Sequence, residues 1–140
     1  MSEAFPRPVT GHVPVLRLGD VLLVTLQGEL HDSMAQQLQQ DIAESIASSR
    51  VTGVLLDLSG VDIVDSFLGR VLAEIAAQAE LLAARTVVTG MRPAVAITLV
   101  ELGLTLPGLR TALTTEAGLE MLGRAVGRAS GAVGEGRESS

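Results

Sequence analysis

The sequence has no cysteine, tryptophan, tyrosine or lysine, and its only aromatic residues are Phe5 and Phe67. Without cysteine the chain can form neither a disulfide nor a zinc–thiolate site, and thiol catalysis is excluded. Without lysine it lacks the residue needed for a Schiff base or a phosphate-binding P-loop. Two aromatic residues give no stacking platform for single-stranded nucleic acid, and the net charge of −6 opposes binding to a phosphate backbone. The sequence therefore predicts no nucleic-acid partner.

Long apolar runs are also missing: no stretch approaches the roughly 20 residues of a membrane span, and no secretion signal is recognisable. We therefore expect a cytoplasmic protein without a membrane partner. The length of 140 residues and the hydrophobic content of 47% fit one domain with an aliphatic core. Local composition predicts a flexible leader at 1–13, a folded domain at 14–128 and a disordered Gly/Ser/Glu-rich tail at 129–140.

Hydrophobic patterning predicts alternating strands and helices. The expected strands are 14–18, 21–26, 52–58, 85–90 and 109–113. One expected helix is capped by Asp32 or Ser33, two begin near Ser66 and at Pro93, and the last is capped by Thr114 or Thr115. Gly19 and Asp20 indicate a two-residue hairpin turn between the first two strands. Because the later strands alternate with helices, we expect a single α/β domain: a small mixed sheet with an opening antiparallel hairpin, then parallel strands, and about four helices packed on it.

The segment from Val61 to Phe67 joins an apolar strand to an apolar-striped helix and places Ser66 where that helix begins. Free N–H groups at a helix start attract negative charge, so Ser66 is either a plain N-terminal cap or a position where a phosphate can be held. Asp65 has two interpretations of equal weight, as the cap itself or as a determinant of kinase recognition. Phe67 is expected to pack in the core, whereas exposure would make it an anchor for a partner.

An enzymatic role for Ser66 is not supported by its surroundings. A serine nucleophile of the hydrolase type needs a Gly-x-Ser-x-Gly elbow, whereas Ser66 lies in Val-Asp-Ser-Phe-Leu, and both histidines precede it. His12 and His31 are isolated from other ligand residues, so both are expected to be loop residues, and no metal site or cofactor is predicted. The paired carboxylates suggest no obvious pocket. Arg92 is expected to be a surface residue, and the alternatives are that it contacts a partner or caps a carboxylate.

The strand, the Val-Asp-x-x-Asp-Ser junction at 61–66 and the following helix resemble the STAS domain family of sulfate transporters and anti-sigma factor antagonists. The Thr-Gly-x-x-Pro block that begins at Thr89 and leads into a helix ending at Gly103 strengthens the match, which covers about residues 14–124. Within the family the sequence is most similar to the STAS-only scaffold antagonists of the stressosome. The resemblance implies a non-catalytic binding module.

The resemblance also implies that Ser66 is phosphorylated by a partner serine kinase of the switch type. From their positions beside Ser66, we expect Asp62, Asp65 and Phe67 to form the partner-binding surface together with it. Thr98 matches a second phosphorylation site of longer family members. Unphosphorylated, the module would assemble with longer STAS-containing co-antagonists into a large oligomer and hold the kinase, and phosphorylation would release it. Two other functions stay open: a simple anti-sigma factor antagonist that binds an anti-sigma kinase directly, and a small-ligand or nucleotide-binding regulatory module.

Overall fold

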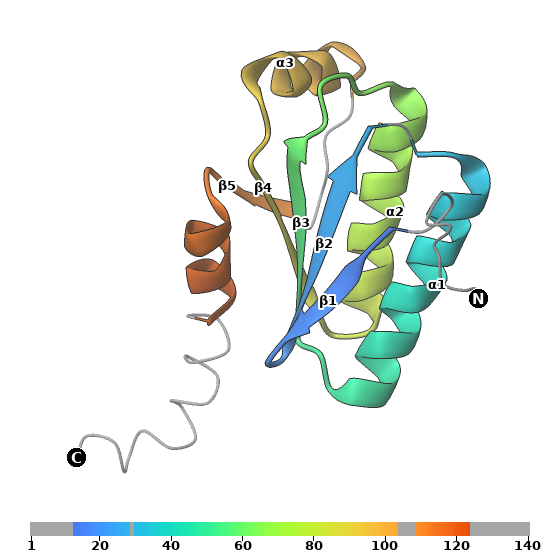
Figure 1. Ribbon diagram of the computed structural model, residues 1–140, viewed down its shortest axis with the longest axis vertical. Helices are drawn as coiled ribbons and strands as arrows, with labels where there is room; N and C mark the ends of the chain where they lie inside the picture. The colour runs from blue at the N-terminus through green and yellow to red at the C-terminus, as the bar shows by residue number, and fades with distance from the viewer. Residues whose placement is uncertain (1–12, 29, 104–108, 124–140) are drawn as a thin grey trace, which may run out of the picture.

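The computed structural model describes residues 13–28, 30–103 and 109–123, which form a mixed sheet with helices on both faces (Figure 1). The elements in chain order are β1 (Val15–Leu18), β2 (Val21–Gln27), α1 (Asp32–Ser49), β3 (Gly53–Gly60), α2 (Ser66–Leu81), β4 (Arg85–Thr89), α3 (Pro93–Glu101) and β5 (Leu109–Ala112). Residues 115–123 form a further helix. In this part of the chain no helix is long and apolar enough to cross a membrane.

Within the described residues the sheet contains five strands, in the order β1-β2-β3-β4-β5. β1 and β2 are antiparallel, and the tight turn between them uses Gly19 at a φ of 63°, which glycine adopts without strain. From β2 to β5 neighbouring strands are parallel, because a helical connection returns the chain to the same end of the sheet each time. The predicted α/β fold, with its opening hairpin and parallel strands, is confirmed.

Helices α1 and α2 cover one face of the sheet, and the helix at 115–123 covers the other (Figure 1). The larger core lies under α1 and α2 and includes Ile42 and Ile75, which are fully buried. The smaller core lies under the last helix, where Leu122 packs with Leu55. Successive residues of β3 alternate between the two cores, which explains why this strand is apolar along most of its length.

Two details differ from the sequence prediction. The N-cap of α1 is His31, with an extended backbone and no side-chain hydrogen bond, rather than Asp32 or Ser33. Asp32 lies instead in the first turn, where its charge complements the positive end of the helix dipole. Val13, predicted as part of the leader, is buried in the larger core, because its apolar side chain packs there just before β1. The rest of the leader and the tail lie outside the described residues, so these divisions stay predictions.

Candidate functional site

The connection from β3 to α2 leads to Ser66 and has a buried and an exposed side. Val61 and Val64 are buried, at 1% and 4% exposure. The N–H of Val61 also closes a turn with a 2.9 Å hydrogen bond to a carbonyl of β3. Between these two valines, Asp62 and Ile63 face solvent, and Ile63 is 82% exposed. The two buried valines anchor the connection, and its outer side is left open to a partner.

Asp65 is the N-cap of α2. Its backbone is extended, with φ −117° and ψ −179°, and its Oδ1 accepts a hydrogen bond from the N–H of Leu68 at 2.9 Å. This contact satisfies one of the N–H groups that have no partner within the helix. Ser66 is therefore the first residue inside the helix, and its interpretation as the cap is wrong. The sequence could not separate the two, because serine and aspartate cap helices about equally well. A role for Asp65 in kinase recognition stays a prediction.

We expect Asp65→Ala to lower the free energy of unfolding by about 1 kcal/mol, because the Leu68 N–H loses its partner. Asp65→Asn keeps an oxygen that can accept the same hydrogen bond, so it should cost much less. Equilibrium unfolding in urea measures both changes. An equal loss in the two variants would show that the charge at the helix start, and not the hydrogen bond, stabilises this end of α2.

Ser66 is exposed in the first turn of α2. Because Asp65 makes the capping hydrogen bond, a modification of the Ser66 oxygen leaves that contact in place. The free N–H groups and the positive dipole end of the helix favour a negative group at this position. Ser66 can thus accept a phosphate without loss of the local fold.

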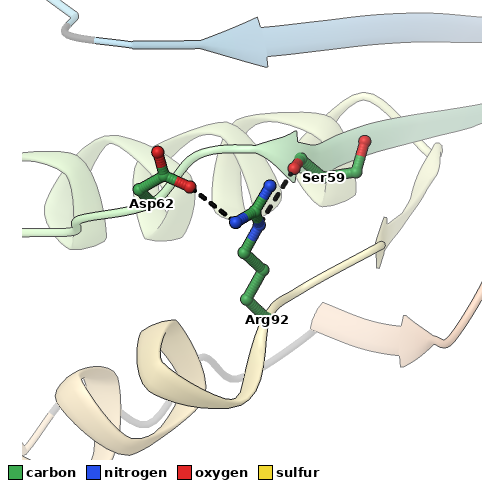
Figure 2. A network of polar contacts seen from close by, with 3 residues as sticks. All are labelled: Ser59, Asp62 and Arg92. Carbon is green, nitrogen blue, oxygen red and sulfur yellow. Dashed lines mark hydrogen bonds and ion pairs between the residues drawn. The ribbon is translucent and has the colours of Figure 1, made fainter.

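Arg92 lies at the surface, as expected, and it also pairs with a carboxylate, which was one of the alternatives; the sequence did not identify its partners. Its Nη1 lies 2.8 Å from Oδ1 of Asp62, and its Nε donates to the carbonyl oxygen of Ser59 at 3.2 Å (Figure 2). Both partners belong to the end of β3 and the connection after it, whereas Arg92 is the N-cap of α3. No local motif signals these contacts, because Ser59 and Arg92 are 33 positions apart and meet only through the pairing of β3 with β4.

A cleft of about 500 Å³ opens beside the connection, which corrects the expectation that the carboxylates lie in no pocket. The segment after β2 and the connection after β3 form its walls, which combine two carboxylates with apolar side chains. The lining residues are Gly28, Leu30, His31, Gly60, Asp62, Ile63, Asp65, Phe67 and Leu68. The sequence could not reveal this cleft, because the ends of the two strands come together only when β2 and β3 pair.

Phe67 is half-buried and packs against the larger core, as expected, and it also lines the cleft. The guanidinium carbon of Arg70, one turn later in α2, lies 5.8 Å from the centroid of its ring. This distance is within the range of a cation–π contact, which restricts the ring further. The anchoring of a partner by Phe67 stays a prediction.

Thr98 lies on α3, apart from the connection that groups Asp62, Asp65, Ser66 and Phe67. Its side chain is half-buried, and its hydroxyl donates to the carbonyl oxygen of Ala94 at 3.0 Å. Phosphorylation of Thr98 would break this hydrogen bond. The side chain of Ser66, in contrast, is exposed to solvent. Of the two candidate acceptors, Ser66 is the more accessible.

The histidines form no ligand cluster in the structure as described. His31 lines the cleft from the N-cap of α1, and His12 lies outside the described residues. Within 13–28, 30–103 and 109–123, no three or more His, Cys, Asp or Glu side chains are grouped so that they could hold a metal ion.

Two solved structures share this fold and a substantial part of the sequence. A serine-to-glutamate variant of RsbS from Moorella thermoacetica is 39% identical, with a TM-score of 0.72, and covers 81% of this chain and 97% of that chain. A chain from a solved structure of the stressosome, which is described as a signal integration and transduction hub, is 41% identical to this chain. Its TM-score is 0.72, and it covers 81% of this chain and 98% of that chain.

Sequence comparison identifies the same family. The profile of the STAS domain matches residues 12–116. RsbRD of Bacillus subtilis (strain 168), an RsbT co-antagonist protein, is 28% identical over 99 residues, which are 70% of this chain and 36% of RsbRD. The chain therefore spans about a third of the length of this relative. It belongs to the STAS domain family and is related to RsbS and to the RsbT co-antagonist protein RsbRD.

Proposed function

We propose that this chain is a stressosome scaffold protein that binds a switch serine kinase and releases it when Ser66 is phosphorylated. The observation that carries the proposal is the position of Ser66, exposed in the first turn of α2 directly after the capping Asp65. A kinase can reach this hydroxyl without opening the fold. The relationship to RsbS supports the assignment to the stressosome.

Phosphorylation transfers the γ-phosphoryl group of ATP to the Ser66 oxygen. The bond between the γ-phosphorus and the bridging oxygen of ADP breaks, a new bond to Oγ forms, and the hydroxyl proton passes to a base of the kinase. The product carries about −1.5 to −2 charge near Asp62 and Asp65. The positive end of α2 stabilises this charge, so phosphorylation changes the affinity for the partner and leaves the fold intact.

The surface that meets the kinase consists of the exposed side of the β3–α2 connection and the cleft beside it. Ile63, at 82% exposure, offers an apolar contact between the carboxylates of Asp62 and Asp65. A partner that covers Ile63 must remove water from this surface. A phosphate on Ser66 raises that cost and repels an acidic partner group, so phosphorylation weakens binding.

The proposal extends to a large cytoplasmic assembly with longer RsbR-like co-antagonists. The Bacillus subtilis relative is named as a co-antagonist of RsbT, and the 41% identical chain comes from a stressosome structure. Because the chain spans 36% of RsbRD, it corresponds to one part of such a protein. To the assembly it contributes the STAS module and Ser66, whose phosphorylation changes the binding of the kinase.

The test uses Ser66→Ala, Ser66→Asp and the wild-type chain with the switch serine kinase encoded in the same genome. We expect Ser66→Ala to bind the kinase as tightly as the unphosphorylated chain and to accept no phosphate at this position. Ser66→Asp should bind at least about ten-fold more weakly, because like charges at an interface are costly. Binding is measured by titration calorimetry, and phosphate is located by mass spectrometry after incubation with ATP.

Ser48→Ala is the matched control, because Ser48 is exposed near the C-terminal end of α1. This variant should bind the kinase and accept phosphate like the wild-type chain. Equal kinase affinities for Ser66→Ala and Ser66→Asp would contradict the switch, as would phosphate found at Thr98 in place of Ser66.

A further inference from the structure

Arg92 joins the N-terminus of α3 to the β3–α2 connection. Its guanidinium group contacts two atoms of one stretch of chain, the carbonyl oxygen of Ser59 through Nε and the carboxylate of Asp62 through Nη1 (Figure 2). Arginine is suited to this task because its planar group presents several donors in a fixed arrangement. Arg92 therefore holds the start of the connection at two points, while Asp65 holds its end at the N-cap of α2.

The backbone before α3 directs Arg92 toward this stretch. Gly90 follows β4 with a φ of +71°, and a Cβ built there would lie 2.9 Å from Cβ of Ser59 and 3.0 Å from Oδ1 of Asp57. Glycine allows the chain after β4 to pass this close to the end of β3. Arg92 then precedes Pro93 with φ −76° and ψ 150°, the extended conformation that a residue before proline prefers.

We propose that Arg92 is a positioning residue for the phosphorylation of Ser66. By holding Ser59 and Asp62 it keeps the segment that leads to Ser66 in one conformation. By pairing with Asp62 it also offsets a negative charge near the serine that must receive a phosphoryl group from ATP. Arg92 forms and breaks no bond in that transfer. The inference rests on the proposed function, in which Ser66 is the substrate of a kinase.

The exposure of the ion pair separates a positioning role from a purely structural one. The side chains of Arg92 and Asp62 are 55% and 71% exposed, and exposed ion pairs add little to the stability of a fold. Loss of Arg92 should therefore leave the domain folded but allow the connection more conformations. Only a fraction of molecules then present Ser66 in the form that the kinase binds, which raises KM and leaves kcat nearly unchanged.

The experiment compares four chains as substrates of the switch serine kinase encoded in the same genome, with ATP: wild type, Arg92→Ala, Arg92→Lys and Arg85→Ala. For Arg92→Ala we expect KM for the protein substrate to rise about ten-fold, with kcat within about two-fold of wild type. Arg92→Lys should recover part of the loss, because lysine restores the charge but not the fixed set of donors. Arg85→Ala removes an exposed arginine at the start of β4, at the other end of the parallel strands, and should behave like wild type.

Amide hydrogen exchange gives a readout that needs no kinase. The N–H groups of Val61 and Leu68 are hydrogen-bonded near the two ends of the connection. In Arg92→Ala both should exchange about three- to ten-fold faster than in wild type, because a looser connection opens more often. Amides in the middle of α1 should keep their rates, since α1 carries neither partner of Arg92.

The value of KM decides the inference. A KM for Arg92→Ala equal to that of wild type, with wild type phosphorylated at Ser66, would overturn the positioning role and leave the proposed function standing. An equal rise in KM for Arg85→Ala would also overturn it, because the effect would then be one of net charge. Absence of phosphate at Ser66 in wild type would overturn the proposed function, and the inference with it. If Arg92→Ala does not fold, Arg92→Lys decides: a KM above that of wild type supports the positioning role, and an equal KM overturns it.

Discussion

Gly90→Ala is expected to lower the free energy of unfolding by about 2–4 kcal/mol, as the sum of two effects. A residue with a Cβ at a φ of +71° is strained by roughly 1–2 kcal/mol. The added Cβ would also lie 2.9 Å from Cβ of Ser59 and 3.1 Å from its backbone nitrogen. Relief of these contacts requires a shift of the backbone at the end of β3, which adds the cost of overpacking. Equilibrium unfolding in urea measures the total.

Gly103→Ala is the matched control for Gly90→Ala. Gly103 has the same φ of +71°, but a Cβ built there meets no atom within 4 Å among the described residues. This variant should therefore lose only the conformational part, roughly 1–2 kcal/mol. Equal losses at the two glycines would show that the close approach of Gly90 to Ser59 costs nothing to relieve, and the expected difference would be wrong.

The order of strands and helices could be predicted from local signals, because each element carries its own pattern. β3 is apolar and is followed by polar residues at the start of α2, and Pro93 begins α3 at the position where a missing N–H costs nothing. Gly103 follows α3 with a positive φ, as expected for the residue after a helix end. The candidate residues around Ser66 could also be found, because the junction is a continuous stretch of the chain.

The contacts around Ser66 could not be predicted, because they join residues that are distant in the sequence. The pairing of Arg92 with Asp62 depends on the neighbouring positions of β3 and β4 in the sheet. The cleft depends on the pairing of β2 with β3, which places His31 opposite the β3–α2 connection. The choice between Asp65 and Ser66 as the cap depends on a difference of one residue in the start of a helix, which residue preferences do not resolve.

Leu56→Ala is expected to lower the free energy of unfolding by about 2–5 kcal/mol, near the upper end of that range. Leu56 is fully buried in the larger core, where β3 is covered by α1 and α2. Both helices are long and pack on each other as well as on the sheet, so neither can move inward to fill the space left by the side chain. A folded domain is stable by only about 5–15 kcal/mol, so this single change removes a large part of its stability.

Leu55→Ala is the matched comparison, because Leu55 is the preceding residue of the same strand and is also fully buried, but in the smaller core. Among the described residues, the helix at 115–123 alone covers this face; it packs through Leu122 and through Gly118, where a Cβ would lie 2.9 Å from Cδ1 of Leu55. A lone helix can shift toward the sheet and reduce the cavity, so we expect Leu55→Ala to cost about 1–2 kcal/mol less than Leu56→Ala. Unfolding in urea with an unchanged m value gives the difference directly. An equal or larger loss for Leu55→Ala would mean that the last helix is held as firmly as α1 and α2.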